Sequence, residues 1–74
     1  MKEEVINLIS KTLEVDKKLL NENTNLIADL DVESLDLIDL VSAFEEKYGM
    51  EIPDQDIKGL QTVGDIIKYL ESHV

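Results

Sequence analysis

A single serine, Ser34, stands among carboxylates in the stretch DLDVESLDLIDL, residues 29–40. A hydroxyl in this setting could attack a substrate, lie beside a metal ion, or accept a covalently attached group. Nucleophilic attack needs a base to take the hydroxyl proton, and no His, Lys or Arg occurs between Asp29 and Val41. Catalysis by Ser34 is therefore disfavoured, and the chain is not expected to be an enzyme.

Calcium binding is the second possibility, since Asp29, Asp31 and Glu33 have the alternating spacing that opens an EF-hand loop. Such a loop requires glycine at its sixth position and glutamate at its twelfth. Ser34 and Leu40 occupy those two positions here. The motif fails, and because the chain has no cysteine and a single histidine, the sequence predicts no metal site.

A covalently attached anion suits Ser34 better. The serine falls in the first turn of a predicted helix, where free N–H groups and the positive end of the helix dipole favour an anion. A phosphate esterified to this hydroxyl would be favourably placed. The alternative is that Ser34 is simply an N-cap, a role that serine often fills, and the residues alone leave both open.

Three segments with helical apolar spacing must position this serine. Gly49 is placed to end the second helix, and Thr62 and Asp65 form a capping-box pattern at the start of the third. The apolar stripes consist of Val5, Leu8, Ile9 and Leu13; of Leu37, Leu40, Val41, Phe44 and Tyr48; and of Val63, Ile66, Ile67, Leu70 and Val74.

The segments between these helices have different signals. In EIPDQDIKGL, residues 51–60, Pro53 and a nearby glycine leave room for a short helix of one or two turns. In NENTNLIADLDVE, residues 21–33, turn residues and the lack of a period predict a long loop, pinned by Leu26, Ile27 and Leu30. The predicted fold is all-α, one domain of residues 1–74: a small bundle of three main helices plus one short helix, with a long loop after the first.

The formal net charge is −10, and the segment from Asp29 to Asp56 holds −9 of it, with ten acidic residues against Lys47 alone. Such a field opposes binding to nucleic acid or an anionic membrane and favours a basic protein partner. No apolar stretch is long enough for a membrane span, and the N-terminus lacks the apolar block of a signal peptide. With no cysteine, these features predict a cytoplasmic monomer.

One face of the second helix is expected to be exposed. At about 100° per residue, Leu35, Asp39 and Glu46 fall opposite Leu37, which we place at the middle of the buried stripe. An isolated exposed leucine is common, so an ordinary solvated face is one interpretation. Beside an acidic strip, however, Leu35 could anchor a partner whose basic residues surround a small apolar pocket.

The stretch DLDVESLDLIDLVSAFEEKYGMEIPDQD, followed by TVGDIIKYL, resembles the acyl carrier proteins of type II fatty acid and polyketide synthesis. The likeness covers essentially the whole sequence. It implies that Ser34 carries 4′-phosphopantetheine, attached covalently from coenzyme A by a separate phosphopantetheinyl transferase. Acyl groups would ride on its thiol as thioesters, for delivery to lipid or polyketide biosynthetic enzymes.

The resemblance also implies roles for other residues. Arg and Lys patches on acyl-transfer and synthase enzymes would recognise Glu33, Leu35, Asp36, Asp39, Glu45 and Glu46. An acyl chain between the second and last helices would be lined by Leu40, Val41, Ile52, Ile57, Leu60 and Ile66, unless these are ordinary core residues.

Two positions depart from the family pattern. Asp31 replaces the usual glycine, and Glu33 replaces the usual aspartate before the serine. Asp tolerates a left-handed backbone better than most residues, so the loop is expected to keep its shape. The longer Glu33 side chain is expected to alter the contact with the transferase. Two other functions stay open: a stand-alone carrier for amino or hydroxy acids, and an unmodified acidic adaptor that docks basic proteins.

Overall fold

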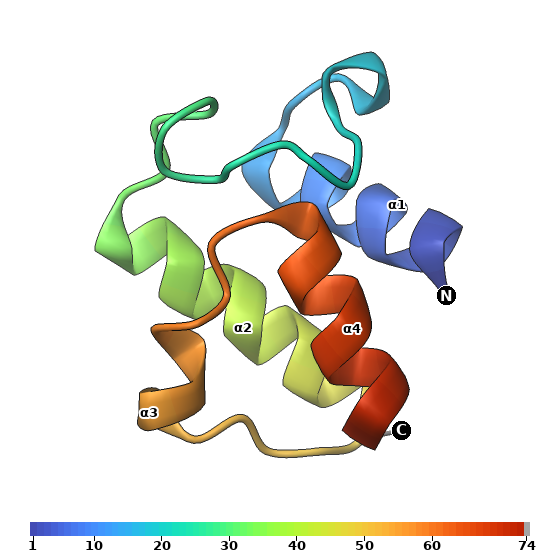
Figure 1. The fold of residues 1–74 in the computed structure, drawn as a ribbon, viewed down its shortest axis with the longest axis vertical. Helices are drawn as coiled ribbons and strands as arrows, with labels where there is room; N and C mark the ends of the chain where they lie inside the picture. Colours follow the sequence, from blue (N-terminus) through green and yellow to red (C-terminus); the bar gives the residue numbers. More distant parts are fainter. Residues whose placement is uncertain (74) are drawn as a thin grey trace.

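The computed structural model describes residues 1–73, which form helices joined by loops with no strand among them (Figure 1). The main helices are α1 (Lys2–Leu13), α2 (Ser34–Tyr48) and α4 (Val63–His73); α3 (Asp54–Ile57) is a single turn, and η1 (Lys17–Leu19) is a 3₁₀ turn. The predicted all-α bundle is confirmed. The sequence pattern did not predict η1, because a turn of three residues is too short to give a periodic signal.

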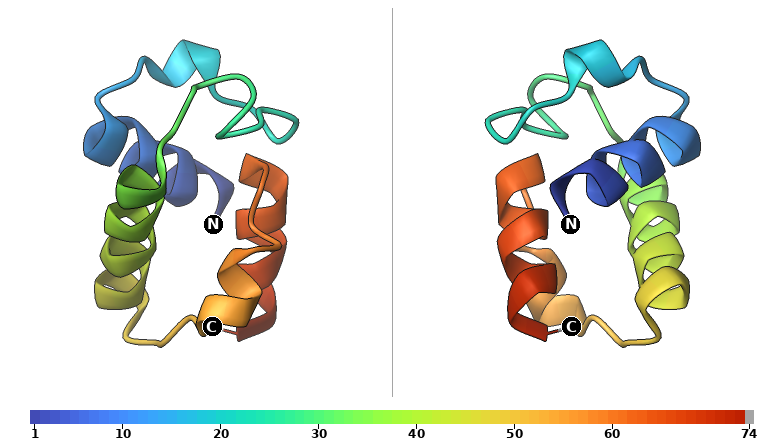
Figure 2. Two further views of the ribbon diagram at one scale, coloured as in Figure 1. Left: turned by 90° about the vertical axis from the view of Figure 1, so that its left-hand side faces the viewer. Right: turned by 90° about the vertical axis from the view of Figure 1, so that its right-hand side faces the viewer.

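The segment between α1 and α2, which comprises η1 and the long loop, covers one end of the bundle (Figure 1). Figures 1 and 2 show α2 and α4 as two sides of the molecule that run in the same general direction, with both N-terminal ends beneath this loop. Helix α1 packs against both of them. Since Ser34 is the first residue of α2, it lies at the end of the molecule that the loop covers.

The core consists of side chains from the three main helices and from the loops. The buried apolar residues are Val5, Ile9, Leu20, Leu26, Leu40, Val41, Phe44, Ile52, Leu60, Val63, Ile66, Ile67 and Leu70. Four predicted stripe residues, Leu8, Leu13, Leu37 and Tyr48, are half-buried against this core. Val74 lies outside the described residues. No helix within residues 1–73 has the length and apolar character needed to cross a membrane.

The predicted helix ends are confirmed. Gly49 ends α2 in the left-handed conformation, with φ 61°, and its N–H donates to the Glu45 carbonyl. At the start of α4, the Asp65 N–H donates to the Thr62 hydroxyl at 3.1 Å, and the Thr62 N–H donates to the Asp65 carboxylate at 3.1 Å. These two bonds are the reciprocal pair of a capping box.

Main-chain hydrogen bonds tie the long loop to the start of α4. Their donors and acceptors are Leu26 N–H to Gln61 O at 2.9 Å, Val63 N–H to Thr24 O at 3.0 Å, and Gly64 N–H to Glu22 O at 2.9 Å. The approach at Gly64 is close: a Cβ there would lie 2.9 Å from the Glu22 carbonyl oxygen. Glycine at this position therefore allows the loop and the helix to meet.

The loop is only partly pinned as predicted. Leu26 is fully buried and Leu30 is half-buried, but Ile27 is 54% exposed. The prediction that Ile27 pins the loop is wrong. The Asn25 side-chain oxygen accepts the N–H groups of Ile27 and Ala28, both at 2.9 Å, and this turn directs Ile27 outward.

Candidate functional site

Ser34 is exposed at the first position of α2. Glu33 precedes it in an extended conformation, with φ −86° and ψ 166°, and occupies the N-cap position without a side-chain capping bond. Ser34 is therefore not the N-cap. The Leu37 N–H reaches the Glu33 carbonyl at 3.0 Å, so the N–H groups of the preceding turn are left to solvent or a ligand. This arrangement suits a phosphate on the serine oxygen.

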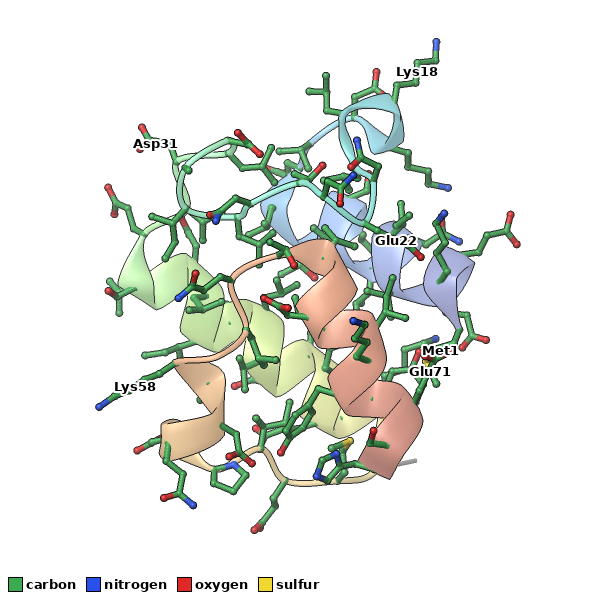
Figure 3. The ribbon with its side chains drawn as sticks, in the orientation of Figure 1. Met1, Lys18, Glu22, Asp31, Lys58 and Glu71 are labelled. Atoms are coloured by element: carbon green, nitrogen blue, oxygen red, sulfur yellow. The ribbon has the colours of Figure 1, made fainter. Side chains whose placement is uncertain are left out.

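The turn before Ser34 depends on Asp31, whose φ is 56°. The Asp31 N–H donates to the Ile27 carbonyl at 3.1 Å, and the Val32 N–H donates to the Leu26 carbonyl at 3.0 Å. In Figure 3, the Asp31 side chain projects outward from the loop. Asp31 thus holds the left-handed backbone that glycine adopts most easily, as its residue type predicts.

A hollow of about 340 Å³ opens beside Ser34, and we call it the Ser34 hollow. Its lining residues are Ile27, Val32, Glu33, Ser34 and Leu37. Leu37 was placed at the middle of the buried stripe, but it is only half-buried, because it lies at the end of α2 on the rim of this hollow. Sequence patterns gave no signal for the hollow, since Ile27 reaches it from the loop.

The outer face of α2 agrees with its predicted position. Leu35 is 73% exposed, and Asp39 and Glu46 are also exposed. Glu33 and Asp36 are exposed at the start of the helix. The sequence reasoning missed Ile38, which is 53% exposed. Its spacing of three residues from Leu35 is the signal that could have found it, because such residues are neighbours on a helix surface.

Glu45 differs from the other predicted docking residues because its carboxylate is used within the fold. Its side-chain oxygen accepts the Ile52 N–H at 2.7 Å, and its carbonyl oxygen accepts the Met50 N–H at 3.1 Å. Glu45 is half-buried, whereas its neighbour Glu46 is exposed. The carboxylate therefore fixes the chain that leaves α2.

The predicted acyl-chain residues come together in the core. Five of the six are buried members of one apolar cluster, and Ile57 packs against it. These residues are Leu40, Val41, Ile52, Ile57, Leu60 and Ile66. They belong to the same core as the apolar residues of α2 and α4, and their contact with cargo stays a prediction.

A hydrogen bond links α3 to α4. The Tyr69 hydroxyl donates to the Asp56 carboxylate at 2.7 Å, and this bond, with burial and the charge of Asp56, raises the pKa of Tyr69 above its usual 10.0. On its other side, the Tyr69 ring stacks on His73, with the ring centroids 4.0 Å apart. The contact gives α3, which has only four residues, a fixed place against the bundle.

Comparison with known proteins decides the family. A family model described as "Phosphopantetheine attachment site" matches residues 3–70. The acyl carrier protein of Lactobacillus acidophilus is 43% identical over 75 residues, covering 96% of this chain and 94% of that protein. The chain belongs to the acyl carrier protein family. As a member, it is a carrier of acyl groups and not a catalyst.

Two further relatives agree with this assignment. The acyl carrier protein of Thermotoga maritima is 45% identical over 67 residues, covering 90% of this carrier and 83% of that protein. A solved acyl carrier protein structure from Mycobacterium tuberculosis has a TM-score of 0.90 at 26% identity, covering 99% of this carrier and 97% of that chain. The helical bundle is therefore the family's fold.

Membership implies a phosphopantetheine prosthetic group, and the residues around Ser34 fit it. The hydroxyl is exposed and does not occupy the N-cap position. The first turn of α2 offers N–H groups to a phosphate. The aliphatic residues of the Ser34 hollow line it together with the same serine and could receive the apolar part of an attached chain.

Proposed function

We propose that Ser34 bears 4′-phosphopantetheine and that residues 1–74 form one carrier domain. The observation that supports this most directly is the exposed Ser34 side chain at the first residue of α2, within the region matched by the attachment-site family. The serine oxygen would attack the phosphorus of coenzyme A that carries the pantetheine. A new P–O bond forms, adenosine bisphosphate leaves, and the serine proton passes to a base of the transferase.

The attached group supplies a thiol, on which acyl intermediates of lipid or polyketide synthesis are held as thioesters. The residues of this chain hold and present it. The first-turn N–H groups at the positive end of α2 would bind its phosphate. Glu33 and Asp36 flank the serine with negative charge and direct basic residues of the transferase to it.

Partner enzymes would bind a docking face on α2 formed by Leu35, Asp36, Ile38, Asp39 and Glu46. Two exposed aliphatic side chains give this face an apolar centre, and three carboxylates surround it. Such a surface fits a small apolar pocket ringed by Arg and Lys. Binding of this kind is steered by charge and weakens as salt rises, which suits a carrier that must leave each enzyme.

Intact-mass measurement tests the attachment. The chain is co-expressed with a phosphopantetheinyl transferase of broad specificity, and we expect a mass increase of one phosphopantetheine. Ser34→Ala should abolish the increase. Ser42→Ala is the matched control, because Ser42 is an exposed serine on the same helix, and this variant should load normally. An unmodified wild-type chain, beside a control carrier that loads, would contradict the proposal and favour an acidic adaptor.

The cargo is tested separately on the loaded protein. Malonyl and aminoacyl loading enzymes are each offered the free thiol, and the product is identified by mass. We expect malonyl transfer, since the relatives are named acyl carrier proteins. Exclusive aminoacyl transfer would instead assign the chain to a carrier for amino acids.

A further inference from the structure

We propose that the Ser34 hollow is a seat for the first segment of the phosphopantetheine arm. This segment, the pantoyl group, has two methyl groups on one carbon and follows the phosphate directly. The proposal rests on the proposed attachment of the arm to Ser34, and it assigns a ligand to Ile27, Val32 and Leu37.

The position of Ser34 makes the arm the natural occupant. Ser34 is itself one of the five lining residues, so the arm begins at the edge of the hollow. Only the phosphate and one methylene separate the serine oxygen from the carbon that bears the two methyl groups. The volume, about 340 Å³, lies at the small end of the range of about 300–1,000 Å³ for small-molecule pockets.

Ile27 gives the hollow its most exposed apolar wall. Three hydrogen bonds hold its backbone in this turn. The N–H groups of Ile27 and Ala28 donate to the Asn25 side chain, and the Ile27 carbonyl accepts the Asp31 N–H. The turn therefore presents an isoleucine, 54% exposed, to a position beside the serine. Contact with the two methyl groups would remove apolar surface of both partners from water.

Because the arm is attached to Ser34, weak contacts are enough to hold its first segment in the hollow. A free ligand that binds in an open hollow loses translational freedom, and its contacts there would have to offset that loss of entropy. An arm fixed to Ser34 is present at an effective concentration on the order of millimolar, as for short flexible links in general. The first-turn N–H groups of α2 hold the phosphate, and this sets the direction in which the arm leaves the serine.

Nuclear magnetic resonance on the loaded protein tests the seat. The two methyl groups of the arm are labelled with carbon-13, and complete loading is first established by mass. We expect nuclear Overhauser effects from these methyls to the methyls of Ile27, Val32 and Leu37. We also expect those three residues to shift between the unloaded and loaded protein when no enzyme is present.

A matched pair of variants makes the test specific. Ile27→Ser should remove the Overhauser effects and give the arm methyls the relaxation rates of a free chain, with loading retained. Leu19→Ser is the control, because Leu19 is 61% exposed, lies in η1 away from the docking face and does not line the hollow. It should leave the arm contacts unchanged.

The possible failures are distinguishable. A fully loaded protein without these Overhauser effects overturns the seat while the attachment stands. Equal loss in both variants also overturns it, since the contact would not be local. Shifts at Ile27 that arise only when a partner enzyme is added assign this residue to docking instead. A chain that does not load at all contradicts the proposed function, and the seat with it.

Discussion

The Glu45 carboxylate accepts the backbone N–H of Ile52 at 2.7 Å, across the turn that ends α2. Ile52 is buried, and its N–H lies where the chain leaves the helix for α3. Two adjacent glutamates of α2 therefore have different tasks. Glu45 stabilises the segment after the helix, while Glu46 is free to meet a partner.

Replacing Glu45 by alanine should destabilise the protein. The Ile52 N–H would lose its acceptor in a partly buried position, at a cost of about 1–2 kcal/mol. Glu46→Ala should change the free energy of unfolding by less than about 0.5 kcal/mol. Urea denaturation of both variants measures the difference. Glu45→Gln keeps an acceptor and should recover most of the loss; similar values for Glu45→Ala and Glu46→Ala would refute the structural role.

Gly64→Ala should be the more harmful of two glycine replacements. Its Cβ would lie 2.9 Å from the Glu22 carbonyl oxygen, a backbone atom that is itself held by the Gly64 N–H. Forced displacement of this kind costs about 1–3 kcal/mol. At Gly59 the nearest atom would be 3.5 Å away, so Gly59→Ala should be neutral or stabilise by up to about 1 kcal/mol. Thermal unfolding compares the two, and the reverse order would contradict the close approach.

The bond between Tyr69 and Asp56 should be visible in a pH titration. It raises the pKa of Tyr69 above 10.0 in the folded protein, so its stabilisation is complete below about pH 10 and is lost as the pH rises through the folded value. In a Tyr48→Phe background, Tyr69 is the single tyrosine, and its absorbance reports ionisation.

Removal of the acceptor by Asp56→Ala should move this titration to lower pH. Tyr69→Phe should cost about 0.5–1 kcal/mol at neutral pH, a modest value because the pair is partly solvated. Urea denaturation at pH 7 measures it. A titration that stays in place after Asp56→Ala would show that the hydrogen bond does not hold Tyr69.

Charge reversal on the docking face should slow loading more than the same reversal elsewhere. We expect Asp39→Lys to lower kcat/KM of a phosphopantetheinyl transferase by about tenfold at low salt, and added salt should reduce the difference. Glu71→Lys is the control with an equal change of net charge, on an exposed position of α4 (Figure 3). Both variants should unfold within about 0.5 kcal/mol of the wild type. Equal losses of kcat/KM would indicate a response to net charge alone.

Features set by local chemistry could be predicted from the sequence. The apolar stripes, the capping box of Thr62 and Asp65, and the Gly49 stop depend on residues within one or two turns of each other. The left-handed backbone of Asp31 and the exposure of Leu35 follow from residue type and helical spacing in the same way.

Features that depend on distant segments could not be predicted. Ile27 is of a residue type that is usually buried, but the turn made by Asn25 directs it outward. It lies beside a helix that begins seven residues later. Glu45 is of a residue type that is usually exposed, but the chain that follows α2 brings the Ile52 N–H to its carboxylate. The Ser34 hollow joins a loop and a helix, so no single periodic pattern describes it.

The main-chain bonds between the long loop and α4 also determine how this end of the molecule can open. The amide protons of Leu26, Val63 and Gly64 all cross that junction, although all three of their acceptors lie in loops. Their exchange with deuterated solvent requires the loop and α4 to separate. Slow exchange at these three amides would therefore show that the long loop stays bound to the start of α4, and it would do so independently of any side chain.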